Sequence, residues 1–353
     1  MKHTKVVAIS GGVDSMTAAF LLKEQGHHVI GIHFITGFET DTYHPAKKKE
    51  DTPHRMDKIG QQLGIPIKLL DCSHTFKQRI VDYFTQTYLA GQTPNPCMVC
   101  NPTIKFGPLL SFARQLGANL LATGHYARIK KDKKGHFHLF KGIDTQKDQS
   151  YFLARLNQSH LAKACFPLGH MKKSDVKQLA QEKGLNPVTR NESQDVCFIK
   201  RDSYGEFISQ LTGLKSEPGP IVDRNGNLLG EHKGLHLFTI GQRRGINCPA
   251  AEPYYVLQID RKHNRLVVGS KTDLLTSACR VVDMNWINQK PTEPIEVFAR
   301  VRYRHKEVAS TLFPVDKNSV EVRFESPQEA VTPGQAAVFY LGQEVLGGGW
   351  ISP

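Results

Sequence analysis

The chain has 353 residues, too many for one ordinary domain, and this length predicts two or three domains. Hydrophobic residues make up 39% of the chain and the mean hydropathy is −0.37; no apolar run reaches the ~18 residues of a membrane-spanning helix, so we expect a soluble protein. A net charge of +13 is unusual for an enzyme that handles only small anionic metabolites. It favours a polyanionic partner such as nucleic acid, although lysines that only solvate the surface would give the same charge.

The amino terminus leads directly into an apolar run at residues 5–9, which predicts a first strand and leaves no room for a secretory signal. A cytoplasmic location is therefore expected. In this setting the seven cysteines indicate metal or catalytic roles before a disulfide framework.

A glycine turn joins this first strand to a helix-like run that begins near Asp14, and its sequence is Ser10-Gly11-Gly12-Val13-Asp14-Ser15. Glycines allow the backbone to approach a ligand closely, and free N–H groups at a helix start favour an anion, so the turn predicts a phosphate site. A carboxylate beside a phosphate suggests a bridging Mg²⁺. The lysine-bearing P-loop is absent, which argues against γ-phosphate transfer of that type. The same hexapeptide also fits a turn that only connects two elements.

Short apolar runs alternate with helical periods over the first ~200 residues. Strands are predicted at residues 29–34, 65–70 and 119–123, and helices over a run that stops at Gly26 and over residues 106–117. This alternation predicts an α/β fold with a parallel sheet that is covered on both faces and binds ligands at the carboxyl ends of its strands. The Ser10 turn lies at such an end.

A C-x-x-C motif, Cys97-Met98-Val99-Cys100, stands in a segment with prolines at 94, 96 and 102, which predicts a rigid, loop-like presentation. Zinc would normally need a second pair of ligands, and the sequence has no second C-x-x-C, so no metal site is predicted. A thioredoxin-like pair is disfavoured because the motif is not expected at a helix start. Catalytic thiol chemistry is the favoured interpretation.

The second thiol of interest is Cys197, which follows a polar turn at residues 191–195. Two thiols from distant parts of a chain can meet in the fold, and thiolate attack on a sulfur–sulfur bond is the basic step of sulfur exchange. The alternative for each is an inert, buried cysteine. That interpretation is given to the remaining cysteines outside the C-x-x-C motif: Cys72, Cys165, Cys248 and Cys279.

After about residue 203 the pattern becomes β-rich, with a hairpin turn at 223–227 and a chain reversal at 260–264. Further strands are predicted at 297–303, 319–324 and 336–341, as in a small barrel or sandwich. We therefore expect domains at 1–203, 204–276 and 277–353. On the 297–303 strand, Arg300, Arg302 and Arg304 would form a cationic stripe suited to phosphates, or a solvated outer face.

Several motifs in order carry a resemblance to a known family: SGGVDS at 10–15, TPNP at 93–96 with Cys100-Asn101, TGHYAR at 123–128, KDQSYFL at 147–153, residues 192–199 and TIGQR at 239–243. The match continues through Arg302-Tyr303-Arg304, Pro333-Gly334-Gln335 and GGGWI at 347–351. The chain thus resembles the bacterial tRNA-specific 2-thiouridylases, the MnmA family, over essentially its full length.

The resemblance implies an N-terminal ATP pyrophosphatase domain of the adenine nucleotide alpha hydrolase-like type, a β-rich central domain and a C-terminal β-barrel. It implies that ATP, with Mg²⁺, adenylates the C2 oxygen of the wobble uridine in tRNAs for Lys, Glu and Gln, and that sulfur replaces this oxygen with release of AMP and diphosphate. Cys197 would accept sulfur as a persulfide from a desulfurase or relay protein, and Cys100 would be the nucleophile that resolves it, leaving a disulfide.

The remaining site residues are also carried over from the resemblance. The residues implied in ATP binding are Ala8, Ile9, Ser10, Gly11, Gly12, Val13, Asp14, Ser15, Phe34 and Gly124. Those implied in contacts with the target base or tRNA are Asn95, Pro96, Cys97, His125, Lys147, Asp148, Gln149, Arg302, Tyr303 and Gln335. A flipped base needs an enclosing pocket. From the residues alone, an ordinary helix start with Asp148 as a capping side chain is the favoured interpretation of 147–153.

Two other functions fit parts of the sequence. An adenylating ligase or amidotransferase acting on a small molecule would use the Ser10 turn but would need neither paired thiols nor a cationic β-domain. A non-catalytic RNA-binding module would use the basic surface alone. The sequence does not identify the sulfur donor, the oligomeric state or the role of Cys97.

Overall fold

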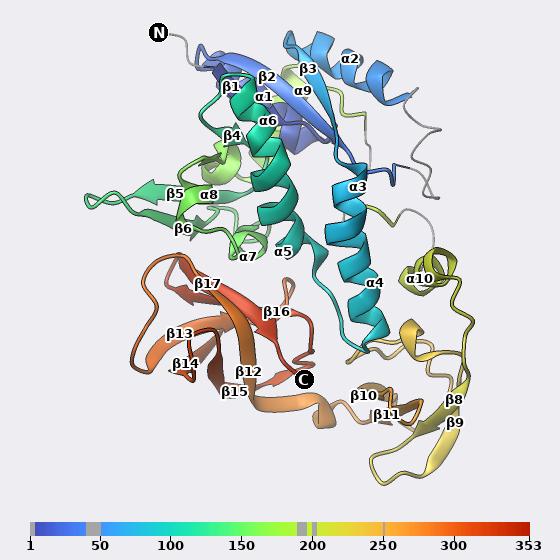
Figure 1. Ribbon diagram of the computed structural model, residues 1–353. Helices are drawn as coiled ribbons and strands as arrows, with labels where there is room; N and C mark the ends of the chain where they lie inside the picture. The colour runs from blue at the N-terminus through green and yellow to red at the C-terminus, as the bar shows by residue number, and fades with distance from the viewer. Residues whose placement is uncertain (1–3, 40–50, 189–195, 200–202, 250) are drawn as a thin grey trace.

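The computed structural model describes residues 4–39, 51–188, 196–199, 203–249 and 251–353 (Figure 1). The polar turn predicted at 191–195 lies outside the described residues. Within the described part, the N-terminal half is an α/β layer structure, followed by a small β-sheet and a β-barrel.

The N-terminal domain is built on a parallel sheet with strand order β3-β2-β1-β4-β7. Its strands are β1 (Thr4–Ala8), β2 (His28–Ile35), β3 (Ile67–Asp71), β4 (Leu121–Ala122) and β7 (Ala164–Cys165). Val6 and Val7 of the central strand β1 are fully buried on opposite faces, as expected for a strand covered on both sides. The predicted parallel sheet is confirmed.

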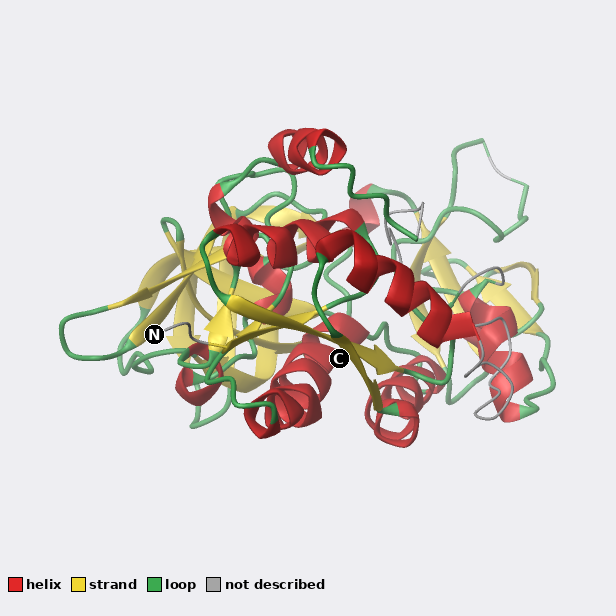
Figure 2. Ribbon diagram, turned by 90° about the horizontal axis from the view of Figure 1, so that it is seen from above, coloured by secondary structure: helices red, strands yellow, loops and turns green. Residues whose placement is uncertain are grey.

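Helices cover both faces of this sheet (Figures 1 and 2). One face packs against α1 (Val13–Glu24), α2 (Asp51–Leu63) and α9 (Lys173–Glu182), and the other against α6 (Leu110–Gln115). The remaining helices of this half are α3 (Ser73–Phe76), η1 (Lys77–Val81), α4 (Asp82–Leu89), α5 (Pro96–Cys100), η2 (Asn101–Leu109), α7 (Ser150–Leu153), α8 (Gln158–Leu161) and η3 (Pro167–His170).

The helix predicted at 106–117 begins earlier than expected. α5, the π-helix η2 and α6 follow one another without a break from Pro96 to Gln115, with a kink at Gly107, whose φ and ψ are −102° and −112°. Pro108, which follows the kink, cannot donate a backbone hydrogen bond, and its ring disfavours the helical conformation at the residue before it, which accounts for the kink at Gly107.

The central domain is a four-stranded sheet with order β10-β11-β8-β9. Its elements are β8 (Gly219–Val222), β9 (Leu228–His232), η4 (Leu235–Leu237), β10 (Tyr255–Asp260) and β11 (Arg265–Gly269), preceded by α10 (Tyr204–Thr212). The hairpin turns predicted at 223–227 and 260–264 are confirmed, because β8 pairs with β9 and β10 with β11 in antiparallel register.

The C-terminal strands form a closed barrel, since β12 pairs with both β15 and β17. Its elements are η5 (Thr272–Leu274), β12 (Leu275–Trp286), β13 (Ile295–Arg300), β14 (Val308–Pro314), β15 (Val320–Glu329), β16 (Ala336–Leu341) and β17 (Glu344–Ile351). A closed barrel leaves few unpaired edges.

The predicted cationic stripe is wrong. β13 ends at Arg300, and residues 301–305 turn away, with the Arg300 Nε donating to the His305 carbonyl at 2.9 Å. Arg302 and Arg304 therefore do not alternate along a strand. Arg302 instead donates from Nη2 to the Ile240 carbonyl at 2.9 Å and to Thr332 Oγ1. Its guanidinium group is therefore bound by protein acceptors and does not face the solvent as expected.

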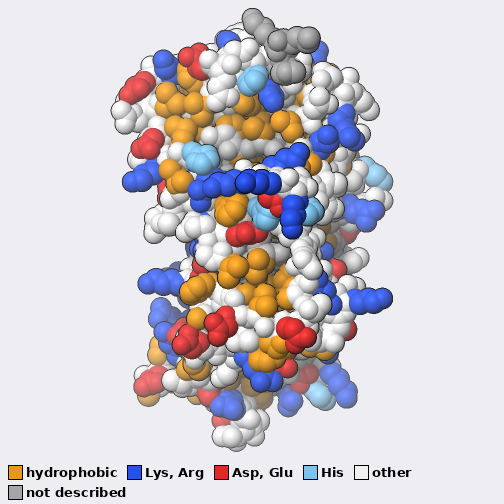
Figure 3. All heavy atoms as spheres, turned by 90° about the vertical axis from the view of Figure 1, so that its left-hand side faces the viewer, with side chains coloured by type: hydrophobic (Ala, Val, Ile, Leu, Met, Phe, Trp, Pro, Cys, Tyr) orange, Lys and Arg blue, Asp and Glu red, His pale blue; other side chains and the backbone are white. Residues whose placement is uncertain are grey.

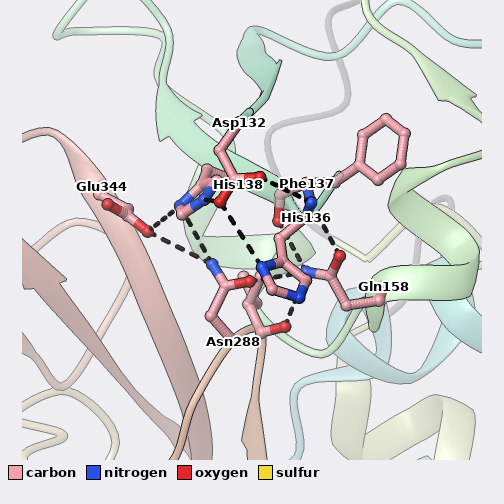
Figure 4. A network of polar contacts seen from close by, with 8 residues as sticks. Asp132, His136, Phe137, His138, Gln158, Asn288 and Glu344 are labelled. Carbon is pink, nitrogen blue, oxygen red and sulfur yellow. Dashed lines mark hydrogen bonds and ion pairs between the residues drawn. The ribbon is translucent and has the colours of Figure 1, made fainter. Parts of the chain in front are cut away.

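A hairpin of the N-terminal half extends the barrel sheet, which the sequence did not predict. This hairpin consists of β5 (Ala127–Lys131) and β6 (Phe137–Lys141), and β6 pairs with β17. A polar network secures the junction (Figure 4): His138 Nδ1 lies 2.7 Å from Glu344 Oε1, and Gln158 Nε2 donates to the Ile287 carbonyl at 2.9 Å. The N-terminal domain and the barrel thus share one sheet.

No helix in the described ranges is long and apolar enough to cross a membrane.

Candidate functional site

The glycine turn at residues 10–15, where the sequence predicts a phosphate site and which we call the nucleotide turn, lies where the strand order of the parallel sheet reverses. β1 has β2 on one side and β4 on the other, and ligands of open α/β sheets bind at the carboxyl ends of strands at such a point. The turn leaves β1 there and enters α1. Gly11 has a φ of +87°, and Ser15 Oγ donates to the Gly12 carbonyl at 2.9 Å and accepts from the Ser10 N–H at 3.2 Å. The turn is held by its own hydroxyls.

Gly124, which follows β4, completes this end of the sheet. A Cβ on Gly124 would lie 2.9 Å from the carbonyl carbon of Asp14 and 3.0 Å from the Ser15 nitrogen, so only glycine fits beside the helix start. Phe34, near the end of β2, is partly buried and packs against the core clusters on both sides of it. Ala8 and Ile9 lead from β1 into the turn.

Asp14 is paired with protein groups. Its two carboxylate oxygens each accept from Lys173 Nζ at 2.7 Å, and Oδ1 also accepts from the Tyr126 hydroxyl at 2.7 Å. Within the described residues, no group of three or more His, Cys, Asp or Glu side chains is arranged to hold a metal ion. Asp14 is thus ion-paired within the protein, and a Mg²⁺ bound at its carboxylate would compete with the Lys173 ammonium group.

The C-x-x-C motif starts a helix, so the predicted loop-like presentation is wrong. Asn95 is the N-cap of α5 and its side chain accepts from the Met98 N–H, while Pro96 fills the first helical turn, where a missing N–H is tolerated. Cys97 and Cys100 lie three residues apart on this helix. The pair therefore stands at a helix start, contrary to the expectation that disfavoured a redox-active pair.

Cys197 is placed near these thiols by its neighbour. Phe198 is 3% exposed and packs edge-to-face on Phe76 and Phe84, with ring centroids 5.7 and 5.2 Å apart. Cys100 packs against the same aromatic cluster. The two thiols that the sequence analysis paired thus come to one cluster from distant parts of the chain.

All three thiols are accessible to some degree, with Cys97 and Cys197 exposed and Cys100 half-buried. The protein around Cys100 nevertheless disfavours charge. Burial raises the pKa of Cys100 to about 12; Lys105 opposes the rise, and the nearby Cys197 and Cys97 add to it. At neutral pH, Cys100 is therefore a thiol, and an attack by Cys100 requires its deprotonation.

The barrel contacts the loop that leads into α5. Gln335 Nε2 donates to the carbonyls of Thr93 and Pro94 at 3.2 and 2.9 Å, and the Thr93 N–H donates to the Pro333 carbonyl at 2.9 Å. Gly334 has a φ of +86°, and a Cβ there would lie 2.9 Å from the Thr93 carbonyl oxygen. The Pro-Gly-Gln turn at 333–335 therefore positions the start of α5, the thiol helix that carries Cys97 and Cys100.

The segment 147–149 is bound mainly to the protein itself. Asp148 is 4% exposed and accepts from the N–H groups of Gly142 and Ser150 at 3.0 and 3.1 Å; it stands one residue before Gln149, the N-cap of α7, so it is not itself the capping residue. Gln149 bonds to the backbone of Tyr126 through both its N–H and its Oε1. Lys147 is half-exposed.

Arg302 and Tyr303 lie at the junction of the barrel with the other domains. Tyr303 packs on Phe152 with ring centroids 4.3 Å apart, and burial raises the pKa of its hydroxyl. Burial lowers the pKa of Arg302, whose guanidinium has buried acceptors as described above.

His125 lies at the boundary between the nucleotide turn and the thiols. It is 9% exposed; its Nδ1 lies 2.6 Å from Thr123 Oγ1 and its Nε2 lies 3.2 Å from Lys105 Nζ. Burial, with a contribution from Lys105, lowers its pKa well below the ordinary value, so the imidazole is neutral. Because Lys105 can only donate, Nε2 is the acceptor and Nδ1–H donates to Thr123.

Three family models match successive parts of the chain: the tRNA methyl transferase HUP domain at residues 3–201, the tRNA methyl transferase PRC-barrel domain at 205–270 and the aminomethyltransferase beta-barrel domain at 276–351. A tRNA-specific 2-thiouridylase MnmA from Desulfosudis oleivorans is 48% identical, with 98% of this chain and 94% of that protein covered. The relative of the same name from Geobacter metallireducens is 44% identical, with 98% and 96% covered.

The chain belongs to the tRNA-specific 2-thiouridylase (MnmA) family. Among solved structures, a predicted subunit of tRNA methyltransferase from Methanocaldococcus jannaschii matches at a TM-score of 0.32 and 17% identity, covering 51% of this chain and 76% of that one. A similarity this low contributes nothing to the argument.

Two lysines at the site of this MnmA family member were missed by the sequence analysis. Lys173 pairs with Asp14 from the start of α9, and Lys105 reaches His125 from η2. The sequence signal for Lys105 was its position five residues after Cys100. For Lys173 no local pattern was available, because it meets Asp14 only through the packing of α9 on α1.

Proposed function

We propose that this chain is a tRNA 2-thiouridylase, an ATP-dependent sulfurtransferase that replaces the C2 oxygen of a uridine in tRNA by sulfur. The observation that carries the proposal is the meeting of Cys100 and Cys197 at one aromatic cluster, in the same parallel-sheet domain as the nucleotide turn. A small-molecule ligase would need the turn but not the thiols.

The chemistry follows from leaving-group strength. A ring oxygen leaves poorly, and its adenylation with release of diphosphate converts it into AMP, a good leaving group. The terminal sulfur of a persulfide on Cys197 then attacks C2 and AMP departs. The Cys100 thiolate attacks the Cys197 sulfur, a Cys100–Cys197 disulfide forms, and the electron pair of the broken S–S bond stays on the sulfur now bound to C2. A thiol reductant restores both cysteines.

We assign the nucleotide to the turn at 10–15 with Gly124, and the target base to the start of α5 at Asn95, Pro96 and Cys97. The support is geometric. N–H groups at the start of α1 favour an anion, and Cys97 is exposed on the same short helix as Cys100. ATP would bring Mg²⁺ on its own phosphate oxygens, with Asp14 remaining paired to Lys173.

The tRNA body requires a wide basic surface. Figure 3 shows Lys and Arg side chains gathered in a band across the middle of one face of the molecule. The β5–β6 hairpin contributes four exposed lysines, Lys130, Lys131, Lys133 and Lys134. We propose that this charge binds phosphates without reading sequence, and that Lys147, Arg302, Tyr303 and Gln335 act nearer the anticodon arm.

The finer assignments are those of the family resemblance. We propose the tRNAs for Lys, Glu and Gln as substrates, a cysteine desulfurase or sulfur-relay protein as persulfide donor, and the cytoplasm as the compartment. We also propose that the catalytic, central and barrel domains divide near residues 203 and 277.

Radiolabelled ATP tests the function directly. We expect diphosphate release only when tRNA is present, and mass spectrometry of the tRNA after addition of a sulfide source should detect 2-thiouridine. The Cys197→Ser variant should lose thiolation supplied by a protein persulfide and keep tRNA binding. Release of diphosphate without tRNA would support the ligase, and no release at all would support a binding module.

A further inference from the structure

Lys105 lies between the nucleotide turn and the thiol of Cys100. It stands in η2, half-buried, and its flanking residues Ile104 and Phe106 are 0% and 3% exposed, which fixes the backbone that carries it. Its ammonium group donates to His125 Nε2 at 3.2 Å. His125 in turn follows Gly124, whose backbone packs on Asp14 and Ser15 at the nucleotide turn.

The π-helical winding of η2 brings Lys105 toward Cys100. In an α-helix with 3.6 residues per turn, two residues five apart point about 140° away from each other. A π-helix joins residues five apart by its hydrogen bonds, so such residues lie on the same side of the helix. Cys100 immediately precedes η2 and Lys105 is its fifth residue. The unusual helix therefore places the ammonium group on the side of the helix that bears the thiol.

Lys105 is the positively charged group that acts on the thiols. The titratable groups that act on Cys100 are Lys105, Cys197, Cys97 and Cys72, and those that act on Cys97 are Cys197 and Lys105. Among the groups that the structure describes there, Lys105 is the one cation; a neighbouring thiol, if ionised, would repel a second thiolate. Lys105 is thus the group that favours the charged form against burial.

His125 fixes the ammonium group. Because its imidazole is neutral and its Nδ1–H donates to Thr123, the Nε2 lone pair points at Lys105 and holds it in place. A lysine without this acceptor would lose the defined position, since its side chain has four rotatable bonds.

We propose that Lys105 is a positioning residue that stabilises the Cys100 thiolate, and that His125 holds the Lys105 ammonium group in place for this role. The part that this thiolate plays in the reaction rests on the proposed function. At the step that forms the Cys100–Cys197 disulfide, Cys100 must lose its proton before its sulfur attacks. A cation beside this sulfur increases the fraction of Cys100 that is ionised.

The pH dependence of Cys100 alkylation tests the inference without tRNA or ATP. The full chain is treated with iodoacetamide from about pH 7 to pH 10, and the peptide that contains Cys100 is quantified by mass spectrometry. In Lys105→Met the profile should move to higher pH, with a rate roughly tenfold lower near pH 8, which corresponds to one pKa unit. Lys105→Arg should restore most of the rate, and His125→Leu should shift the profile in the same direction by less.

Controls separate this effect from misfolding and from the function itself. Lys68→Met removes an equal charge from an exposed position on β3 and should leave the profile unchanged, and circular dichroism reports whether each variant folds. Identical profiles for the unmodified chain and folded Lys105→Met would overturn the inference while leaving the thiouridylase proposal intact. Failure of the unmodified chain to thiolate tRNA would overturn the proposed function, and the alkylation profiles would still show whether Lys105 stabilises the Cys100 thiolate.

Discussion

At the scale of single residues, the nucleotide turn depends on an ion pair that reaches across two helices. Lys173 is 8% exposed at its side chain and Asp14 33%, so water can solvate the carboxylate but hardly the ammonium group. A buried charge without its partner is strongly unfavourable, whereas a partly exposed one is less so. The pair therefore matters more for Lys173 than for Asp14, and the position of α9 against α1 depends on it.

Replacing Lys173 by methionine should destabilise the N-terminal domain by about 1–3 kcal/mol, because Asp14 loses two 2.7 Å bonds yet keeps the Tyr126 hydroxyl and partial solvation. ATP affinity should also fall, since a cation next to the turn is lost. Urea unfolding and calorimetric titration with ATP measure the two effects. Lys172→Met, at the exposed neighbouring position, is the matched control, and equal behaviour of the two variants would contradict the prediction.

At the scale of elements, periodicity and turn chemistry predicted the parallel sheet, the hairpins at 223–227 and 260–264, and the strand at 336–341. They failed at the proline-rich segment. α5 was expected to be a loop because of its prolines, although Asn95 and Pro96 are a local helix-start signal. The bond from Gln335, 241 residues further along the chain, to the loop before α5 is a long-range contact. A local pattern contains no information on such a contact.

The element that carries Cys197 should depend on one aromatic ring. Phe198→Ala removes the ring that packs on Phe76 and Phe84, and large-to-small changes at a buried phenylalanine are typically worth about 3–5 kcal/mol. Since this ring anchors a short segment, we expect the segment to detach before the domain unfolds. Formation of a Cys100–Cys197 disulfide under mild oxidation, followed by peptide mass spectrometry, should then slow at least tenfold.

Phe207→Ala is the control for this effect, because it takes the same volume from the same aromatic cluster but lies on α10: it removes one ring that Phe198 packs on and keeps the Phe198 ring and its contacts with Phe76 and Phe84. If both variants slow disulfide formation equally, the cluster as a whole, and not the Phe198 anchor, positions the thiol.

At the scale of the whole molecule, the β5–β6 hairpin makes the catalytic domain and the barrel parts of one sheet. The backbone pairing is short, with Phe140 opposite Glu344 and Leu139 opposite Val345. Side chains reinforce it, including Lys141, whose ammonium group lies 2.5 Å from Glu307 Oε2. Because Gln335 of the same barrel also contacts the loop before α5, movement of the barrel would be transmitted to the thiol helix.

His138 makes this junction sensitive to pH. Its hydrogen bond with Glu344, assisted by Asp132, raises the pKa of His138 above the ordinary value, because both carboxylates favour the imidazolium that donates from both nitrogens (Figure 4). A raised pKa in the folded state means that the charged histidine stabilises the junction. This contribution is complete below the ordinary histidine pKa of about 6.5 and is lost as the pH rises through the raised value.

Hydrogen exchange of the β6 amides should show this directly. After correction for intrinsic rates, the unmodified chain should protect β6 better than His138→Gln at about pH 6, and the difference in protection should vanish as the pH approaches about 9. This difference should not exceed roughly 1 kcal/mol, since the His138–Glu344 pair is partly exposed. His136→Gln, at a neighbouring histidine whose side chain is 61% exposed, should behave like the unmodified chain. A protection difference that stays constant over this range would mean that His138 stabilises the junction by packing alone, because only a titrating charge makes the difference disappear in that window.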